Sequence, residues 1–137
     1  MKLKKNLYLL HEISNREVET KLFLSFVANK YGYRCYVLQR SFFLENIKKF
    51  YPGIVVYKSL IGSDLHTIEL IKRNNHKVIC IDEEGILQWE EEFKFKLRID
   101  EKVLDKCHKL FVMNSRHKNR ILKYYKNKRL SKKVIAS

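Results

Sequence analysis

The chain has 137 residues, 45% of them hydrophobic and 12% aromatic, so residues 1–137 contain enough apolar material for one domain with a continuous core. Its three cysteines are odd in number and far apart, which argues against disulfides and zinc sites. The sequence has neither a run of ~20 apolar residues nor a signal-peptide cleavage site, so a cytoplasmic location is expected. The formal net charge of +14 has two possible explanations. It either serves to bind phosphates in nucleic acid, anionic lipid or charged sugar donors, or it reflects only a lysine-rich coding bias on solvated helix faces.

Apolar stretches with strand character alternate with helical patterns along the chain. The expected strands cover residues 7–13, 33–39, 54–57, 77–81, 109–113 and 133–136. The expected helices cover residues 15–30, 42–51, 64–74, 101–107 and 116–126. Ser14 and Glu17 have the spacing of a capping box at the start of the first helix.

This β-α order predicts an α/β protein with a Rossmann-like, three-layer αβα fold and a mainly parallel sheet. The fourth strand, with the sequence VICI at residues 78–81, is apolar without alternation, which is typical of a strand covered on both faces. The last expected strand, at residues 133–136, ends close to Ser137. We expect it to be either an edge strand or the entry to a further part of a longer gene product.

Three carboxylates and a glycine follow the fourth strand directly: Asp82, Glu83, Glu84 and Gly85. The carboxyl ends of parallel strands form the rim of the sheet where ligands bind, so an acidic cluster at this place is a candidate for proton-transfer chemistry. The alternative is that Asp82 and Glu83 only cap the segment that follows.

Polar residues also follow the first strand. His11 and Glu12 lie at its end, and Arg16 lies just inside the first helix, where free N–H groups and the helix dipole favour an anion. Arg16 could therefore hold the carboxylate or phosphate of a ligand, with His11 and Glu12 facing the same rim. The alternatives are a surface arginine paired with Glu12 or Glu19, and a His11 that is a hydrogen-bonded structural residue.

Four segments together resemble the amino-terminal domain of bacterial surface carbohydrate biosynthesis proteins. They are LLHEISNREVETKLFL at residues 9–24, YGY at 31–33, PGIVVYKS at 52–59 and IDEEG at 81–85. The resemblance implies a glycosyltransferase of the GT-B architecture, in which two Rossmann-like domains face each other across a cleft. This chain would be the acceptor-side domain, and the nucleotide-binding carboxyl-terminal domain would be absent from it.

The residues Glu83-Glu84-Gly85 are also similar to the acid-acid-Gly motif of bacterial sialyltransferases and related Kdo transferases, which use CMP-activated acidic sugars. The first acid of that motif is the general base, which implies Glu83 in this role, with Asp82 and Glu84 tuning its pKa and Gly85 allowing a close approach to the acceptor. These enzymes use no bound metal and no cofactor besides the nucleotide-sugar substrate. Their His-Pro motif is missing here, since the only proline is Pro52.

The resemblance therefore implies transfer of a sugar from a nucleotide-activated donor to a carbohydrate or lipid-linked glycan acceptor, in surface polysaccharide or lipopolysaccharide assembly. A second Rossmann-like domain or subunit would have to supply the nucleotide site. The basic second half of the chain would hold the protein at anionic headgroups on the inner face of the membrane.

Two other classes compete with this interpretation. A nucleic-acid-binding module would explain the charge and the pair Tyr124-Tyr125 among basic residues, but it leaves the acidic strand end unexplained, so nucleic acid is not the expected partner. A receiver-like phosphoacceptor domain would need an acidic pair after the first strand and a lysine after the fifth. The sequence has His11-Glu12 and Met113-Asn114-Ser115 at these places.

Overall fold

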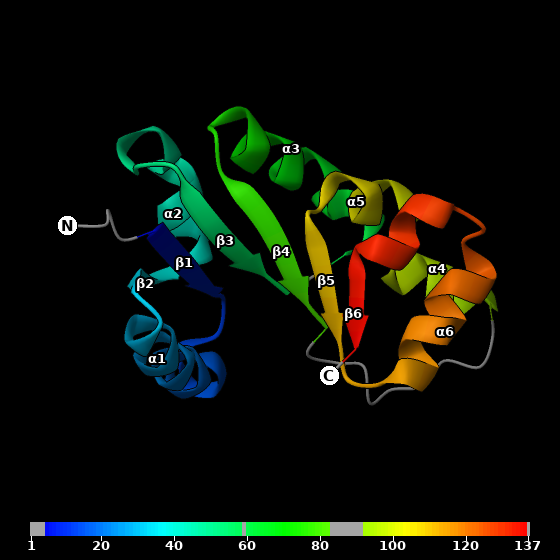
Figure 1. The fold of residues 1–137 in the computed structure, drawn as a ribbon. Coiled ribbons are helices and arrows are strands. Elements are labelled where there is room, and N and C mark those ends of the chain that lie inside the picture. Colours follow the sequence, from blue (N-terminus) through cyan, green and yellow to red (C-terminus); the bar gives the residue numbers. More distant parts are fainter. Residues whose placement is uncertain (1–4, 59, 83–91, 137) are drawn as a thin grey trace. The chain divides into compact units, whose positions relative to one another are not determined.

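The computed structural model describes residues 5–58, 60–82 and 92–136. The chain forms two compact units: the first contains Met1–Tyr57 and Ile71–Lys77, and the second contains Lys58–Leu70 and Val78–Ser137. Within each unit parallel strands are flanked by helices (Figure 1). The Rossmann-like α/β class predicted from the sequence is therefore confirmed.

The first unit contains three parallel strands in the order β2-β1-β3, which are β1 (Lys5–His11), β2 (Tyr33–Gln39) and β3 (Gly53–Tyr57). The helices α1 (Ser14–Lys30) and α2 (Arg40–Glu45) both contact β1 and β2. Because β2 and β3 lie on opposite sides of β1, right-handed crossovers place α1 and α2 on opposite faces of these strands. The reversal of direction at β1 makes the carboxyl ends of β1 and β3 a topological switch point.

The second unit contains β4 (Lys77–Ile81), β5 (Lys109–Val112) and β6 (Val134–Ala136), which are parallel and follow one another in this order. Its helices are α4 (Glu92–Arg98), α5 (Glu101–Lys106) and α6 (Ser115–Tyr124), and α6 contacts β5 and β6. The boundary between the units passes through α3 (Leu65–Arg73) and the first residue of β4. Short 3₁₀ helices cover Ile47–Lys49, Gly62–Asp64 and Lys128–Lys132.

All six predicted strands are present at the predicted places, and the helices differ in three details. The second helix ends at Glu45 and gives way to a 3₁₀ turn, and the sequence did not predict α4. The expected capping box is not formed in the predicted way. Ile13 is the N-cap of α1, and the Glu17 carboxylate accepts a hydrogen bond from the backbone N–H of Glu12 at 2.8 Å.

The core of the first unit is an aromatic cluster centred on Tyr8 of β1. The ring of Tyr8 stacks on Tyr36 at 5.2 Å between centroids and meets Phe43 at 5.1 Å and His76 edge-on at 5.3 Å. Its hydroxyl donates to the carbonyl of Tyr51 at 2.6 Å, and burial with the neighbouring Tyr36 raises the pKa of Tyr8 to about 12. The phenol therefore stays protonated and keeps its hydrogen bond at neutral pH.

The core of the second unit is aliphatic and includes two thiols. Val78, Leu110 and Val134 are buried on its three strands. Cys80 and Cys107 are buried with their Sγ atoms 3.4 Å apart, and none of the three cysteines of the chain forms a disulfide. The hydrogen bond with Cys107 and burial raise the pKa of the Cys80 thiol well above its ordinary value, so this thiol stays protonated.

No helix in the described part of the chain is long and apolar enough to cross a membrane.

We predict that His76 makes the first unit sensitive to acid. This side chain is 3% exposed, neither ring nitrogen forms a hydrogen bond among the described residues, and burial lowers its pKa. Below pH about 6.5 this histidine is therefore protonated in the unfolded chain while it stays neutral in the folded chain. The free energy of unfolding consequently falls as the pH falls, by at most about 1.4 kcal/mol per pH unit for one histidine. Urea unfolding at a series of pH values measures this slope.

The control for this prediction uses two variants. His76→Phe should remove part of the slope, because the new ring fits an aromatic environment and does not titrate. His66→Gln, at an exposed histidine, should leave the slope unchanged. Equal slopes in His76→Phe and the wild type would show that His76 is not responsible.

Candidate functional site

In the first unit Arg40 connects the carboxyl ends of all three strands. It follows β2 directly, and its guanidinium forms an ion pair with the Glu12 carboxylate, one residue beyond β1. The same guanidinium lies over the ring of Tyr57, the last residue of β3, with 5.0 Å between Cζ and the ring centroid. The planar guanidinium suits both contacts, which a lysine could not reproduce together.

The start of α1 adds a second carboxylate to this place. Glu17 is 5% exposed and receives the backbone N–H of Glu12, so the loop between β1 and α1 is held against the helix. Arg16 lies 3.5 Å from the Glu17 carboxylate but keeps 65% of its side chain exposed. The residues Glu12, Arg16, Glu17, Arg40 and Tyr57 are called the Arg40 cluster below.

The structure thus brings Glu12 and Arg16 together at the switch point, where both contact the Glu17 carboxylate. The sequence suggested Glu12 or Glu19 as an ion partner of a surface Arg16. In the structure Arg16 pairs with Glu17 instead, and Glu12 pairs with Arg40. His11 is half-buried at the end of β1, and its Nδ1 atom is buried without a hydrogen bond among the described residues.

In the second unit the end of β4 carries a buried carboxylate. Asp82 is 7% exposed, and its Oδ1 atom forms an ion pair with the guanidinium of Arg98, the last residue of α4. Its Oδ2 atom lies 3.5 Å from Nε2 of His117 in the first turn of α6 and forms no hydrogen bond with any residue that the structure describes. These three side chains are called the Asp82 triad below.

Packing and a helix cap position the two partners of Asp82. Phe95 and Ile99 are buried and anchor α4 and the residue after it, and the backbone of Asp100 donates to the carbonyl of Leu60 at 2.8 Å. At the start of α6 the side chain of Asn114 accepts the backbone N–H of His117 at 2.9 Å. Asn114 is therefore the N-cap, and Ser115 is the first helical residue.

The environment of His117 opposes its protonation. Burial lowers its pKa, Asp82 raises it, and Arg98 and Arg120 lower it again. The imidazole is therefore neutral at pH 7, when Arg98 supplies the positive charge that compensates Asp82. Its Nδ1 atom is buried and forms no hydrogen bond within the described residues.

Glu83, Glu84 and Gly85, the predicted acid-acid-Gly motif, lie outside the described residues, as do Glu90 and Glu91. Among the residues that are described, no group of three or more His, Cys, Asp or Glu side chains is arranged to hold a metal ion. The chemical features visible at the two strand ends are therefore paired carboxylates, guanidinium groups and one neutral imidazole.

The sequence did not predict Arg40, Arg98 and His117 as members of these clusters. Arg40 had a weak signal, because it follows a strand directly, as Glu12 and Asp82 do. Arg98 had none, because the helix that carries it was not expected. His117 was seen only as part of a basic run, where its burial against Asp82 could not be predicted.

Comparison with known proteins gives no family assignment. No protein-family model matches the chain, and no curated protein matches it significantly.

We predict that Arg98→Met destabilises the protein by about 3–5 kcal/mol at pH 7, because it leaves the buried Asp82 carboxylate without its cation. Urea unfolding at pH 7 measures this loss.

A matched control lies on the same helix. Lys96 pairs with Glu92 one turn away, with both side chains about half exposed, so Lys96→Met should cost less than about 0.5 kcal/mol. Similar losses in the two variants would show that burial gives the Asp82–Arg98 pair no special importance.

Proposed function

We propose that this chain is the acceptor-side domain of a glycosyltransferase in surface polysaccharide or lipopolysaccharide assembly. The enzyme transfers a sugar from a nucleotide-activated donor to a carbohydrate or lipid-linked glycan. In the enzymes that the chain resembles, this donor is CMP-linked. The observation that carries the proposal is the buried Asp82 at the end of β4, fixed by Arg98 immediately before Glu83-Glu84-Gly85. A carboxylate that only capped the next segment would not need a partly buried cation from a helix.

In this proposal Glu83 is the general base. Sugar transfer to a hydroxyl requires a base that takes the proton of the hydroxyl while the new glycosidic bond forms and the nucleotide phosphate leaves. Asp82 acts through its position, since its pairing with Arg98 holds the backbone where the motif begins. Glu84 raises the pKa of Glu83 by repulsion between like charges, and Gly85 leaves room for the acceptor.

The Arg40 cluster supports binding of an acidic acceptor. Arg16 is mostly exposed in the first turn of α1, where free backbone N–H groups favour an anion. Within the described part of the chain it pairs with Glu17 at 3.5 Å. Glu12 and Arg40 keep the neighbouring loop in place. We therefore assign Arg16 to a carboxylate or phosphate of the acceptor, with His11 and Glu12 as neighbours that accept or donate hydrogen bonds to its hydroxyls.

The donor side requires a second Rossmann-like domain or subunit. The enzymes that this chain resembles bind the CMP phosphate with a His-Pro motif, and Pro52 of this chain follows Tyr51. In our proposal the chain supplies the acceptor site and the base, and its partner supplies the nucleotide site.

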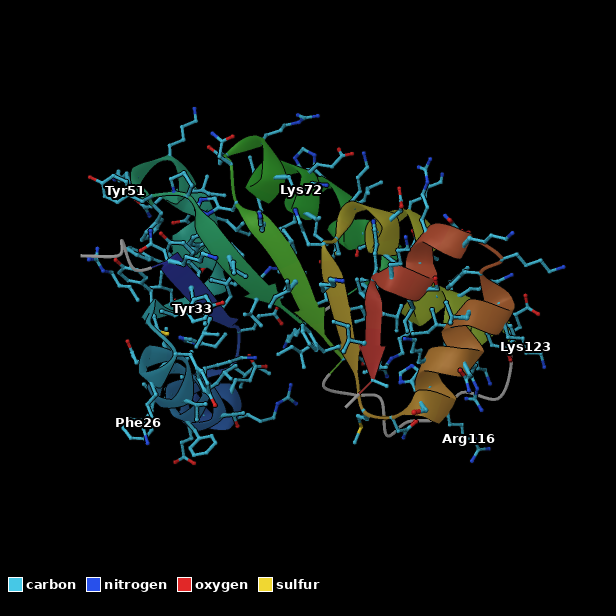
Figure 2. All side chains as sticks on the ribbon, in the orientation of Figure 1. Phe26, Tyr33, Tyr51, Lys72, Arg116 and Lys123 are labelled. Atoms are coloured by element: carbon cyan, nitrogen blue, oxygen red, sulfur yellow. The ribbon has the colours of Figure 1, made fainter. Side chains whose placement is uncertain are left out.

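The nucleic-acid alternative is weakened by the position of its aromatic residues. Tyr125 is buried and donates a hydrogen bond to the carbonyl of Ile99, while Tyr124 packs against Phe95 with 5.0 Å between ring centroids. Neither ring is therefore free to stack on bases. Arg116 and Lys123, labelled on α6 in Figure 2, are exposed, but two basic side chains of this kind are common on a solvated helix.

We predict that Glu83→Gln lowers kcat for sugar transfer by at least about 100-fold, because the amide cannot accept the proton of the acceptor hydroxyl. The assay combines the chain with its nucleotide-binding half, a CMP-activated acidic sugar and a lipid-linked glycan. The unfolding midpoint and acceptor binding should stay at wild-type values.

Glu92→Gln is the control, because this nearby exposed acid pairs only with Lys96 among the contacts described, and its activity should be unchanged. Full turnover by Glu83→Gln would reject Glu83 as the base. An absence of transfer from every nucleotide-activated sugar, by the assembled wild-type protein, would reject the function itself.

A further inference from the structure

The outer face of α1 is unusually apolar for an exposed surface. Leu22, Phe23 and Phe26 are 52%, 70% and 61% exposed, and the spacing of these residues and Lys30 places all four on one side of the helix. Figure 2 shows Phe26 on the side of α1 that faces away from β1 and β2. These four residues are called the outer face of α1 below.

The opposite side of the same helix is charged where apolar residues would be expected. Glu17 and Lys21 are 5% and 2% exposed, although both lie on the side of α1 that packs towards its strands. A surface helix normally turns its apolar residues inward and its charges outward. Here two aromatic side chains and a leucine stay outside, so packing within the first unit does not explain them.

Basic residues lie towards the carboxyl-terminal end of this apolar face. Lys30 holds its Nζ atom 4.6 Å from the centre of the Phe26 ring. Lys5 on β1 and Arg34 on β2 are exposed. In the strand register Lys5 lies opposite Tyr33 and Asn6 lies opposite Arg34. Lys5 and Arg34 therefore lie at the amino ends of their strands, near the carboxyl end of α1. Among the described residues of α1, Glu19 is the exposed acid on this side of the helix, so the three cations outweigh its charge.

We propose that the outer face of α1 docks onto an anionic membrane surface. Phenylalanine and leucine side chains on a helix can enter the boundary between headgroups and acyl chains, while lysine and arginine beside them contact anionic headgroups. The combination of exposed aromatic rings with cations at one end of the face matches both parts of that environment. This inference concerns a surface of the first unit, whereas the sequence alone suggested only a general attraction by the basic second half.

Two other occupants fit the same face less well. A second copy of the chain would bring another net charge of +14 to the interface, and this repulsion opposes self-association. Nucleic acid would be held by cations and stacked rings, and it gains little from an exposed leucine. A lipid surface uses the leucine, the rings and the cations together.

The test is sedimentation with large vesicles of phosphatidylcholine, with and without phosphatidylglycerol, which needs neither a sugar donor nor an acceptor. The wild type should bind the vesicles that contain phosphatidylglycerol and bind more weakly as salt is added. The double variant Phe23→Ser/Phe26→Ser should lower the partition coefficient on the order of 10-fold or more, because two apolar side chains no longer leave water. Its circular dichroism and unfolding midpoint should match the wild type.

Phe93→Ser is the matched control, since Phe93 on α4 is 71% exposed, as Phe23 is at 70%, and lies in the second unit. It should bind vesicles as the wild type does. Unchanged binding of Phe23→Ser/Phe26→Ser, or an equal loss in Phe93→Ser, would overturn the proposal.

The same variant separates the other two occupants. A dimer in analytical ultracentrifugation that the double variant disrupts, or oligonucleotide binding that it abolishes, without vesicle binding in either case, would also overturn the proposal. The membrane surface and the glycosyltransferase activity can fail independently, because Glu83→Gln should bind vesicles normally and Phe23→Ser/Phe26→Ser should keep its catalytic residues.

Discussion

A buried carboxylate at the end of β4 constrains much of the second unit. An ionised Asp82 that is 7% exposed requires a cation close by, and the structure supplies it from Arg98 at the end of α4. This helix must therefore be correctly placed, and the buried Phe95 and Ile99 place it. The positions of the strand end and of the helix therefore depend on each other through this ion pair.

Both units fix a charged strand end with an arginine from outside that strand. Arg40 binds the carboxylate that follows β1 and covers the last ring of β3, while Arg98 binds the carboxylate that follows β4. The guanidinium suits this task because it stays charged and donates in a fixed plane. Such paired strand ends keep their geometry before a ligand arrives, which is what a binding or catalytic rim of a parallel sheet requires.

The strands could be predicted from the sequence because burial gives them continuous apolar runs such as VICI at residues 78–81. The helix α4 could not, because Phe93 to Arg98 alternates apolar and basic residues in the manner of a strand, while only Phe95 of these six is buried. The acidic strand end and the charged end of β1 were visible in the sequence. Their partners Arg98, His117 and Arg40 were not, because those contacts join segments that are far apart in the chain.

Local rules failed where tertiary contacts took over the side chain concerned. The Ser14 and Glu17 spacing predicted a local cap, but the Glu17 carboxylate receives the N–H of Glu12, which lies before the helix. The tyrosines at 124 and 125 suggested a stacking surface, and both pack inside the second unit instead. In α1 the usual relation between burial and polarity is reversed, which no periodicity argument could have predicted.

The most direct test of this account is an NMR titration of the His117 imidazole in the wild type and in Asp82→Asn. An ionised Asp82 beside His117 raises a pKa that burial and two arginines lower, so the pKa should lie below 6.5 in the wild type and fall further in the variant. An unchanged or higher pKa in Asp82→Asn would contradict the account, because it would mean that no buried negative charge lies beside this histidine at the end of β4.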